Sequence, residues 1–379
     1  MKKLKKLYLT RFKKVKYFLK FPFKCDLIIY TDINKQKLFE SLSLEKKILY
    51  IYRFDYGINI LFFILSFLIF FFKKISLKEK YFLFICKLYK PKLIVTTFDN
   101  DVFFYKIGKL TNTKTCIIQN GYRGYDNDIF SKLEKAENKD FFVDYKFLFG
   151  PSVGNLYNKY VNGKNIYIGS FANNFVKNID KESSNLSIGF ISQFREVKEY
   201  LADTDVLNFL NKYCLKNDSK LNIYLLGSKK IFGRASEILE SELSYYNKIL
   251  TCKKKLFIRN ETLDNYKWLQ NDNVIVNIDS TLGYEMLGRR KKVVFFNIRD
   301  TDEKYHGYCK QKTHNFGWPT KYEDYGVCWS NINNQSKFEE ILNYAITTPN
   351  NVWRDKTNNI IDNIMKFDYQ NKEIRRILI

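Results

Sequence analysis

Residues 274–296 constrain the fold of this chain more than any other segment. They predict a buried strand at 274–278, a loop of small polar residues, a short helix at 282–287 and a second buried strand at 292–296. A strand, a helical crossover and a second strand form a βαβ unit, and such units build parallel sheets flanked by helices. The loop should therefore lie at the carboxyl end of a parallel strand, where open α/β sheets bind ligands.

The residue types in this loop predict the kind of ligand. Asp279, Ser280 and Thr281 form the loop, and Gly283 and Glu285 follow in the first turn of the helix. A Ser or Thr hydroxyl can cap the helix, and the free N–H groups of its first turn attract a phosphate. The Glu285 carboxylate can accept hydrogen bonds from sugar hydroxyls. We therefore interpret these five residues as a donor-binding site for a nucleotide sugar.

Strand and helix signals alternate along the whole chain, and its 379 residues are enough for two domains of ordinary size. The first half predicts strands at 26–31, 47–52, 92–97, 114–119, 141–150 and 165–169. After a polar segment at 172–186, a second series predicts strands at 187–192, 220–226 and 255–258 ahead of the loop at 279–281. We predict an α/β fold of two Rossmann-like domains with an interdomain cleft. Residues 1–175 would form the acceptor and membrane side, and residues 176–379, with the C-terminal helices, the donor side. The helix at 338–345 and the tail to residue 379 either close the second domain or return to the first.

Two polar loops follow predicted strands of the first domain. One contains Asp99 and Asp101, candidate catalytic bases for an acceptor hydroxyl, with Asp126 and Asp128 as weaker candidates. The structural alternative is that Asp99 or Asp101 caps the helix that follows. The second loop supplies the candidate acceptor-orienting and sugar-orienting residues, which are Gln119, Asn120, Gly121 and Arg123.

Two further loops of the second domain predict donor contacts. Ser192, Gln193 and Arg195 follow one predicted strand, and Arg259 follows another. Arginine side chains and helix N-termini offset the negative charge that develops on a departing phosphate. Participation of Arg195 and Arg259 in structural ion pairs is the alternative.

The net charge of +24 does not by itself indicate a nucleic-acid partner. Lysine outnumbers arginine 52 to 12, whereas proteins that read nucleic acid favour arginine for bidentate contacts. We therefore expect no nucleic-acid binding.

Two segments suggest contact with the inner membrane surface. Residues 1–25 carry ten Lys or Arg and no acid, with apolar residues between them at helical spacing. This pattern is typical of an amphipathic helix on an anionic membrane, and an ordinary basic N-terminal element is the alternative. Residues 58–72 predict an apolar helix too short to span a bilayer, which either dips into the membrane or packs in the core.

The remaining signals favour a cytoplasmic protein, peripheral at the inner membrane. No signal peptide is evident, and the seven cysteines form no CxxC pair. His306 and His314 lie in no Cys/His cluster, so no metal is expected. No GxGxxG or P-loop motif is present, so no cofactor is expected beyond a nucleotide-sugar co-substrate.

Several motifs carry a family resemblance. The segments IDSTLGYEMLGRRKKVVFF, CIIQNGYRGYDNDIF, IYIGSFANN and IGFISQFRE resemble those of bacterial surface-carbohydrate biosynthesis proteins, of the O-antigen or capsule type, which look like GT-B-fold glycosyltransferases. The resemblance covers residues 92–330. It implies a metal-independent transfer of sugar from a nucleotide donor to a glycan or lipid-linked acceptor. Ser280 and Thr281 are also similar to the pair that sialyl- and Kdo-type transferases use on a CMP-linked donor, although the His-Pro dipeptide of those enzymes is missing.

Three alternatives stay open at this point. A sugar-nucleotide epimerase or a polyol-phosphate transferase can share the two-domain plan. A non-catalytic partner in polysaccharide assembly could retain nucleotide binding without turnover.

Overall fold

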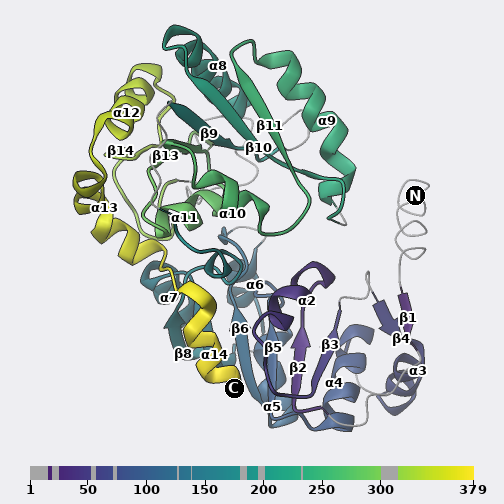
Figure 1. Cartoon of the computed structure of the whole chain (residues 1–379). Helices are drawn as coiled ribbons and strands as arrows, with labels where there is room; N and C mark the ends of the chain where they lie inside the picture. Colours follow the sequence, from purple (N-terminus) through teal and green to yellow (C-terminus); the bar gives the residue numbers. More distant parts are fainter. Residues whose placement is uncertain are drawn as a thin grey trace.

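The chain folds into two α/β domains, which Figure 1 shows one above the other. The predicted fold class, an α/β protein with two Rossmann-like domains, is confirmed. The structure is a computed structural model, and it describes residues 16–18, 25–52, 57–70, 75–125, 128–137, 139–179, 186–194, 201–231, 234–299 and 315–379.

The first domain is built on a parallel sheet with the strand order β3-β2-β5-β6-β7-β8. Its central strands are short runs of Leu, Ile and Val, and β2 and β5 are buried along their whole length. Such runs are typical of parallel strands that helices cover on both faces. The strands are β2 (Leu27–Tyr30), β3 (Ile48–Ile51), β5 (Leu93–Thr96), β6 (Lys114–Ile118), β7 (Phe142–Leu148) and β8 (Asn162–Tyr167).

Alternate residues of these strands enter two separate cores, as the period of two in a strand requires. Ile28 of β2 lies in a core with residues of α4 and α5. Its neighbours Leu27 and Ile29 lie in a core with residues of α2 and of the C-terminal helix α14. The helices of this domain are α2 (Ile33–Glu40), α4 (Leu77–Tyr89), α5 (Phe104–Thr111), α6 (Ile129–Glu134) and α7 (Pro151–Asn158).

The second domain is built on a sheet with the order β11-β10-β9-β12-β13-β15-β14, in which β14 and β15 pair antiparallel and the other neighbours are parallel. Its strands are β9 (Ser187–Ile191), β10 (Lys220–Ser228), β11 (Lys254–Arg259), β12 (Val274–Asn277), β13 (Val293–Phe296), β14 (Tyr325–Gly326) and β15 (Trp329–Ser330). Its helices are α8 (Leu201–Lys216), α9 (Arg234–Ile249), α10 (Asp264–Leu269), α11 (Thr281–Gly288), α12 (Gln335–Thr347) and α13 (Asn350–Ile364).

In both sheets the order in which strands are added reverses, at β2 in the first domain and at β9 in the second. The chain runs from β2 to β3 and then returns to β5 on the other side of β2. In the second domain it runs from β9 through β10 to β11 and returns to β12 on the other side of β9. Doubly wound sheets bind ligands in the crevice at the carboxyl ends of strands beside such a reversal. Each domain therefore offers one binding edge.

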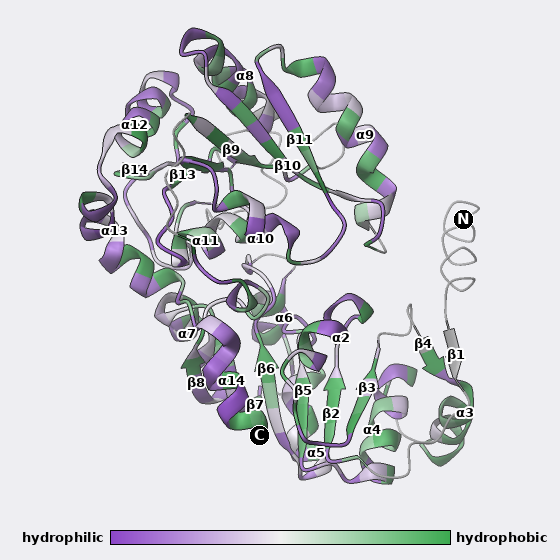
Figure 2. Ribbon diagram, viewed as in Figure 1, coloured by the Kyte–Doolittle hydropathy of each residue, from purple (hydrophilic) through white to green (hydrophobic). Residues whose placement is uncertain are grey.

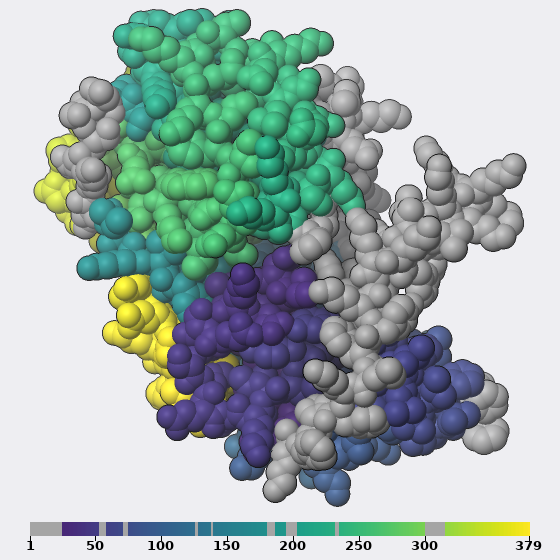
Figure 3. Space-filling view, turned by 45° about the vertical axis from the view of Figure 1, so that its right-hand side comes forward, coloured from purple at the N-terminus to yellow at the C-terminus, as the bar shows by residue number. Residues whose placement is uncertain are grey.

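The end of the chain returns to the first domain. Ile374 and Leu378 of α14 (Lys372–Leu378) are fully buried in the core that contains Leu27 and Phe39. Figure 3 shows the yellow C-terminal residues against the purple and blue residues of the first domain. The division into 1–175 and 176–379 thus differs from the structure, because an apolar stripe on the last helix completes the core of the other domain.

The apolar segment predicted at 58–72 forms α3 (Ile60–Ile69), which Figure 2 shows as strongly hydrophobic at the outer edge of the first domain. It packs on α4, with Phe62 and Ser66 buried, and follows directly on β4 (Gly57–Asn59). Within the described parts of the chain, every helix is too short or too polar to cross a bilayer. Most of the basic segment 1–25 lies outside the described residues.

Candidate functional site

A cavity of about 370 Å³ lies between the two domains, at the carboxyl ends of both sheets. Its first wall comes from the ends of β2, β5 and β6 and the segment after β8, with Lys35, Thr97, Ile118, Gln119, Asn120, Ser170, Phe171 and Ala172. Its second wall comes from the ends of β9 to β12 and the helices after them, with Ile191, Ser192, Tyr224, Leu225, Leu226, Arg259, Thr262, Asn265, Tyr266, Ser280, Thr281, Leu282 and Glu285. Both strand-order reversals thus open on one space.

The loop between β12 and α11 has the predicted form. Ser280 is the N-cap of α11, and its hydroxyl oxygen accepts a hydrogen bond from the N–H of Leu282 at 3.3 Å. The Asn277 side chain fixes the loop, since it accepts from the N–H of Ser280 and donates to its carbonyl. Gly283 is required by packing, because a Cβ there would lie 2.3 Å from the Asn277 amide. The N-terminus of α11 therefore opens into the cavity on a fixed loop.

Asp279, the other residue of that loop, lies away from the cavity lining. Its carboxylate is buried and accepts a hydrogen bond from Arg299 Nη1 at 2.5 Å. The same guanidinium binds the carboxylate of Asp203 on α8 through Nε and Nη2. The structure thus places Asp279 in a buried ion network that anchors the loop, and the sequence-based role as a direct donor contact finds no support in this geometry.

Glu285 lies on the cavity side of α11 and is only 4% exposed. Burial raises the pKa of its carboxyl, while hydrogen bonds from Ser170 and Tyr266 and the charge of Lys35 act in the opposite direction. Ser170 and Tyr266 also line the cavity. Among the described lining residues, Glu285 carries the one carboxylate, and the hydroxyls of Ser170 and Tyr266 donate hydrogen bonds to it.

Arg259 ends β11 and faces the same cavity. Its Nη2 donates to the carbonyl of Leu226 at 3.0 Å, and its buried Nε has no hydrogen-bond partner. Burial lowers the pKa of this guanidinium. A desolvated cation with spare donors is costly unless an anion binds it, so Arg259 marks the position of a negatively charged ligand group.

The predicted donor loop after β9 is only partly at the cavity. Ser192 lines it, accepts a hydrogen bond from the Tyr246 hydroxyl at 2.7 Å and donates to the Glu242 carboxylate. Gln193 is outside the cavity lining, and its buried Oε1 has no hydrogen-bond partner. Arg195 lies outside the described residues.

The two candidate bases do not reach the cavity. Asp99 is fully buried, and Arg123 donates to it through Nε at 2.9 Å and Nη2 at 2.5 Å. Asp101 forms an ion pair with Lys78. Neither acid lines the cavity, and neither caps α5 through its side chain. Because the Arg123 guanidinium is bound to Asp99, it is not available to orient a ligand, which is the role predicted for it from the sequence. Of the weaker candidates, Asp128 caps α6, and Asp126 lies outside the described residues.

The loop after β6 does reach the cavity through Gln119 and Asn120. The Gln119 amide is already used by the backbone, since it donates to the Gly121 carbonyl at 3.1 Å and accepts from the N–H of Phe149 at 2.9 Å. Asn120 accepts a hydrogen bond from the ammonium group of Lys35. Gly121 lies beside Thr281, where a Cβ would be in ordinary contact at 3.8 Å.

Sequence reasoning missed Lys35, Thr97, Ser170 and Tyr266. Lys35 lies in the first turn of α2, 3.7 Å from the capping residue Asp32, and burial lowers its pKa. The sequence contains a signal for it, since an Asp directly after a predicted strand is a typical helix cap. Ser170 directly follows the predicted strand at 165–169, which is a comparable signal, whereas none marks Tyr266.

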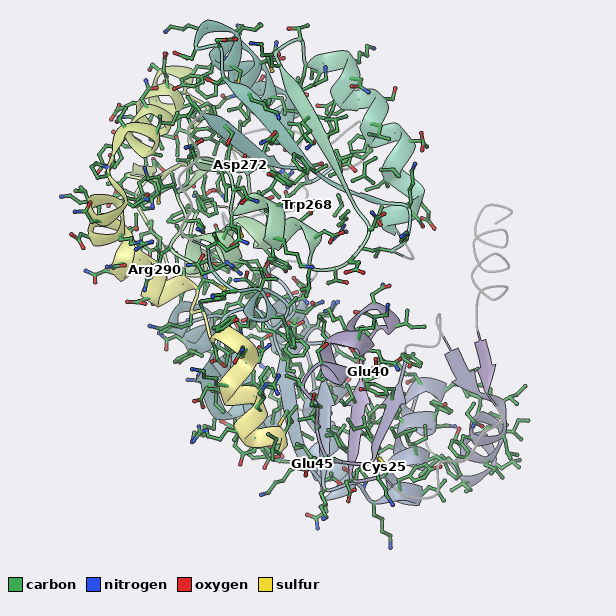
Figure 4. All side chains as sticks on the ribbon, viewed as in Figure 1. Cys25, Glu40, Glu45, Trp268, Asp272 and Arg290 are labelled. Atoms are coloured by element: carbon green, nitrogen blue, oxygen red, sulfur yellow. The ribbon has the colours of Figure 1, made fainter. Side chains whose placement is uncertain are left out.

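The side chains around the second domain's binding edge are shown in Figure 4, in which Trp268 and Asp272 mark the end of α10 and the turn before β12. Asp272 accepts hydrogen bonds from Tyr224 at 2.5 Å and from Asn222 at 2.6 Å. Arg290, also labelled, binds Asp362 of α13 at 2.7 Å. These contacts stabilise the scaffold. Tyr224 lines the cavity, whereas Asp272, Asn222, Arg290 and Asp362 lie outside its lining.

A comparison with protein families identifies one family. Residues 116–205 and 198–378 match a family whose description reads "putative O-antigen biosynthesis protein". No curated protein sequence matches the chain.

Solved structures show the same fold at low sequence identity. The UDP-GlcNAc 2-epimerase of Methanocaldococcus jannaschii is 12% identical with a TM-score of 0.52, over 93% of this chain and 99% of that one. The UDP-GlcNAc 2-epimerase of Neisseria meningitidis is 12% identical with a TM-score of 0.51, over 93% and 98%. The wall teichoic acid polymerase TagF is 9% identical with a TM-score of 0.51, over 93% and 88%. The two-domain arrangement is therefore of the GT-B type.

Proposed function

The chain belongs to this family of O-antigen biosynthesis proteins, and we propose that it is a glycosyltransferase that moves a sugar from a nucleotide-sugar donor to a glycan or lipid-linked acceptor. The observation that carries the proposal is the grouping of Arg259, the N-terminus of α11 and Glu285 on one wall of the interdomain cavity. A cation, a helix N-terminus and a carboxylate match the phosphate and hydroxyl groups of a nucleotide sugar.

The donor phosphate would bind at Ser280, Thr281 and Arg259. Ser280, Thr281 and Leu282 at the start of α11 line the cavity, and the N-terminus of a helix carries partial positive charge. The guanidinium of Arg259, whose buried Nε has no hydrogen-bond partner, supplies a full positive charge. As the bond between the anomeric carbon and the phosphate oxygen breaks, these groups would offset the negative charge on the leaving nucleotide. No metal ion enters this scheme.

The donor hydroxyls would bind at Glu285. The hydroxyls of Ser170 and Tyr266 donate hydrogen bonds to its carboxylate and would orient it for a ligand. Because an ionised carboxylate is an acceptor only, it suits the hydroxyl groups of a ribose or of the transferred sugar.

The acceptor would lie against the first wall. Among the described residues of that wall, Lys35 is the one titratable group, and Asp99 and Asp101 are excluded from it. Burial lowers the pKa of Lys35, which raises its neutral fraction and its ability to take a proton from an acceptor hydroxyl. We therefore transfer the role of general base from the two acids to Lys35. Lys35→Met should abolish transfer while leaving donor binding within a few-fold of the unsubstituted protein, and unchanged transfer would contradict this assignment.

The proposal places the reaction at the cytoplasmic face of the inner membrane, where lipid-linked glycans are accessible as acceptors. The nucleotide stays open among CMP, UDP, GDP and dTDP. A calorimetric and thermal-shift series with sugars of all four nucleotides would identify it, starting with UDP-GlcNAc, which the structurally similar epimerases bind. A ligand at a hundred times its dissociation constant should add about 2.7 kcal/mol to the free energy of unfolding. Absence of a shift with all four classes would contradict the proposal.

One observation favours epimerisation as the second candidate. Lys35 and Glu285 belong to opposite walls and interact electrostatically across the cavity, which is the arrangement of an acid and a base on either side of one sugar. An epimerase needs no acceptor. Incubation with the donor alone, followed by product analysis, separates the two: an epimeric nucleotide sugar indicates the epimerase, and turnover that requires an acceptor indicates the transferase. A transferred polyol phosphate would appear in the same assay as a product that retains phosphate.

A further inference from the structure

The helix α3 (Ile60–Ile69) presents its apolar face to the outside. Ile64, Leu68 and Ile69 are 50%, 63% and 59% exposed, and Ile60, Leu61 and Phe67 are also exposed. Positions 60, 64 and 68 recur every four residues, so they form one continuous stripe. We call the six exposed residues the α3 face.

The buried side of α3 carries its one polar residue. Ser66 is 1% exposed, and its hydroxyl donates to the carbonyl of Phe63 at 2.7 Å. A helix on the surface of a water-soluble domain normally has the opposite pattern, with polar residues outside and apolar residues inside. Contiguous exposed apolar surface of this kind marks an interaction site.

Positive charge lies next to the α3 face. On α4, the ammonium groups of Lys80 and Lys87 lie 5.6 Å and 5.1 Å from the ring centroids of Phe67 and Phe70. Lys80 is buried, whereas Lys87 is exposed, as lysines at membrane interfaces are. The strand β1 (Lys16–Phe18) pairs in parallel with β4 (Gly57–Asn59), which leads directly into α3, and it belongs to an N-terminal sequence with ten basic residues and no acid.

The size of the face argues against a second copy of the chain as its partner. A helix of ten residues is only about 15 Å long, so the α3 face alone is smaller than the about 800 Å² that a stable protein interface buries on each partner.

We propose that the α3 face docks the protein on an anionic bilayer. The helix would lie in the interface, with its apolar side chains among the acyl chains and Lys87 at the headgroups. This inference does not rest on the proposed transferase reaction, since any enzyme that acts on a lipid-linked substrate can use such a surface.

The test is co-sedimentation of the full-length protein with vesicles. Phosphatidylglycerol with phosphatidylethanolamine provides the anionic surface, and phosphatidylcholine alone provides the neutral one. The variant Ile64→Gln with Leu68→Gln removes the centre of the face at two exposed positions. The matched control, Leu110→Gln with Leu215→Gln, changes two leucines that are 54% and 57% exposed elsewhere on the molecule. Circular dichroism and thermal melting verify that both variants fold.

We expect the unsubstituted protein and the control to bind anionic vesicles. The partition coefficient of the α3 variant should be lower by about tenfold or more. Binding should fall as salt is raised, because part of it is electrostatic. Equal partitioning of the α3 variant and the control would overturn the proposal, as would failure of the unsubstituted protein to bind. A dimer that the α3 substitutions dissociate would also overturn it and would identify a second copy as the partner. Donor binding, measured by calorimetry, should be the same in all three proteins, which separates this outcome from that of the proposed function.

Discussion

The backbone N–H of Tyr122 donates a hydrogen bond to the side-chain oxygen of Thr281 at 2.9 Å, which joins the loop after β6 to the first residue of α11. Beside this bond, the rings of Tyr122 and Tyr284 stack with centroids 4.3 Å apart and planes at 12°. A hydroxyl that accepts one hydrogen bond can still donate its own proton. Thr281 can therefore hold the first domain and a ligand phosphate together, which links ligand binding to the relative position of the domains.

The first prediction concerns this hydroxyl. Thr281→Val keeps the shape of the side chain but removes both hydrogen bonds, each of which is worth about 0.5–1.5 kcal/mol. We expect nucleotide-sugar affinity, measured by calorimetry, to fall about tenfold, whereas Thr281→Ser should stay within about threefold of the unsubstituted protein. If Thr281→Val binds the donor with full affinity, the hydroxyl contributes nothing to the phosphate site.

The second prediction concerns the buried guanidinium of Arg259. Arg259→Met removes a desolvated charge whose Nε has no hydrogen-bond partner, so the ligand-free protein should be as stable as before or more stable. Donor binding should fall by about 10- to 100-fold, because charge-assisted hydrogen bonds contribute about 1.5–3 kcal/mol. Thermal melting with and without the donor measures both effects. A loss of ligand-free stability would show that Arg259 is a structural residue instead.

The third prediction separates structure from catalysis at Asp99. Because its buried carboxylate is paired with Arg123 through two hydrogen bonds, Asp99→Ala leaves an unpaired buried cation and should cost about 3–5 kcal/mol in the free energy of unfolding. The double variant Asp99→Leu with Arg123→Leu should recover most of that loss, and denaturant unfolding measures it. Asp101→Ala, which breaks a partly exposed pair with Lys78, should cost about 1 kcal/mol or less. Full stability of Asp99→Ala together with a loss of turnover would return Asp99 to the list of catalytic groups.

Local sequence patterns were sufficient to predict the fold and the loop that begins α11. Buried runs such as those of β12 and β13 identify parallel strands, and the capping residue Ser280 identifies the start of α11. These features depend on neighbours in sequence, so a sequence displays them directly.

The partners of charged side chains could not be predicted in the same way. Asp99 and Asp279 follow strands, as catalytic acids often do, but each is neutralised by an arginine, Arg123 or Arg299, that lies 20 or more residues away in sequence. Burial, which decides whether an acid is a ligand contact or part of an ion pair, comes from tertiary packing. The sequence left open whether the C-terminal tail closes the second domain or returns to the first, since an apolar stripe does not specify which core it completes.

The last prediction concerns pH and Glu285. Burial raises the pKa of this carboxyl above its ordinary value of 4.5, so the folded protein binds the proton more tightly than the unfolded chain does. The stabilisation from this proton is complete below the unfolded pKa and is lost as pH rises through the raised pKa. Glu285→Gln, which stays uncharged, should therefore melt close to the unsubstituted protein at low pH. Above the raised pKa it should melt at a higher temperature, by an amount on the order of 1 kcal/mol in the free energy of unfolding. Melting curves between pH 4 and 8 measure the gap, and Glu240→Gln, at an exposed acid of α9, is the control that should show none.

Glu285→Gln should also lose donor affinity at neutral pH, because an amide cannot replace a carboxylate that accepts two hydroxyl protons. A melting-temperature gap that does not change with pH would show that Glu285 keeps its ordinary pKa, and undiminished donor binding would remove it from the site.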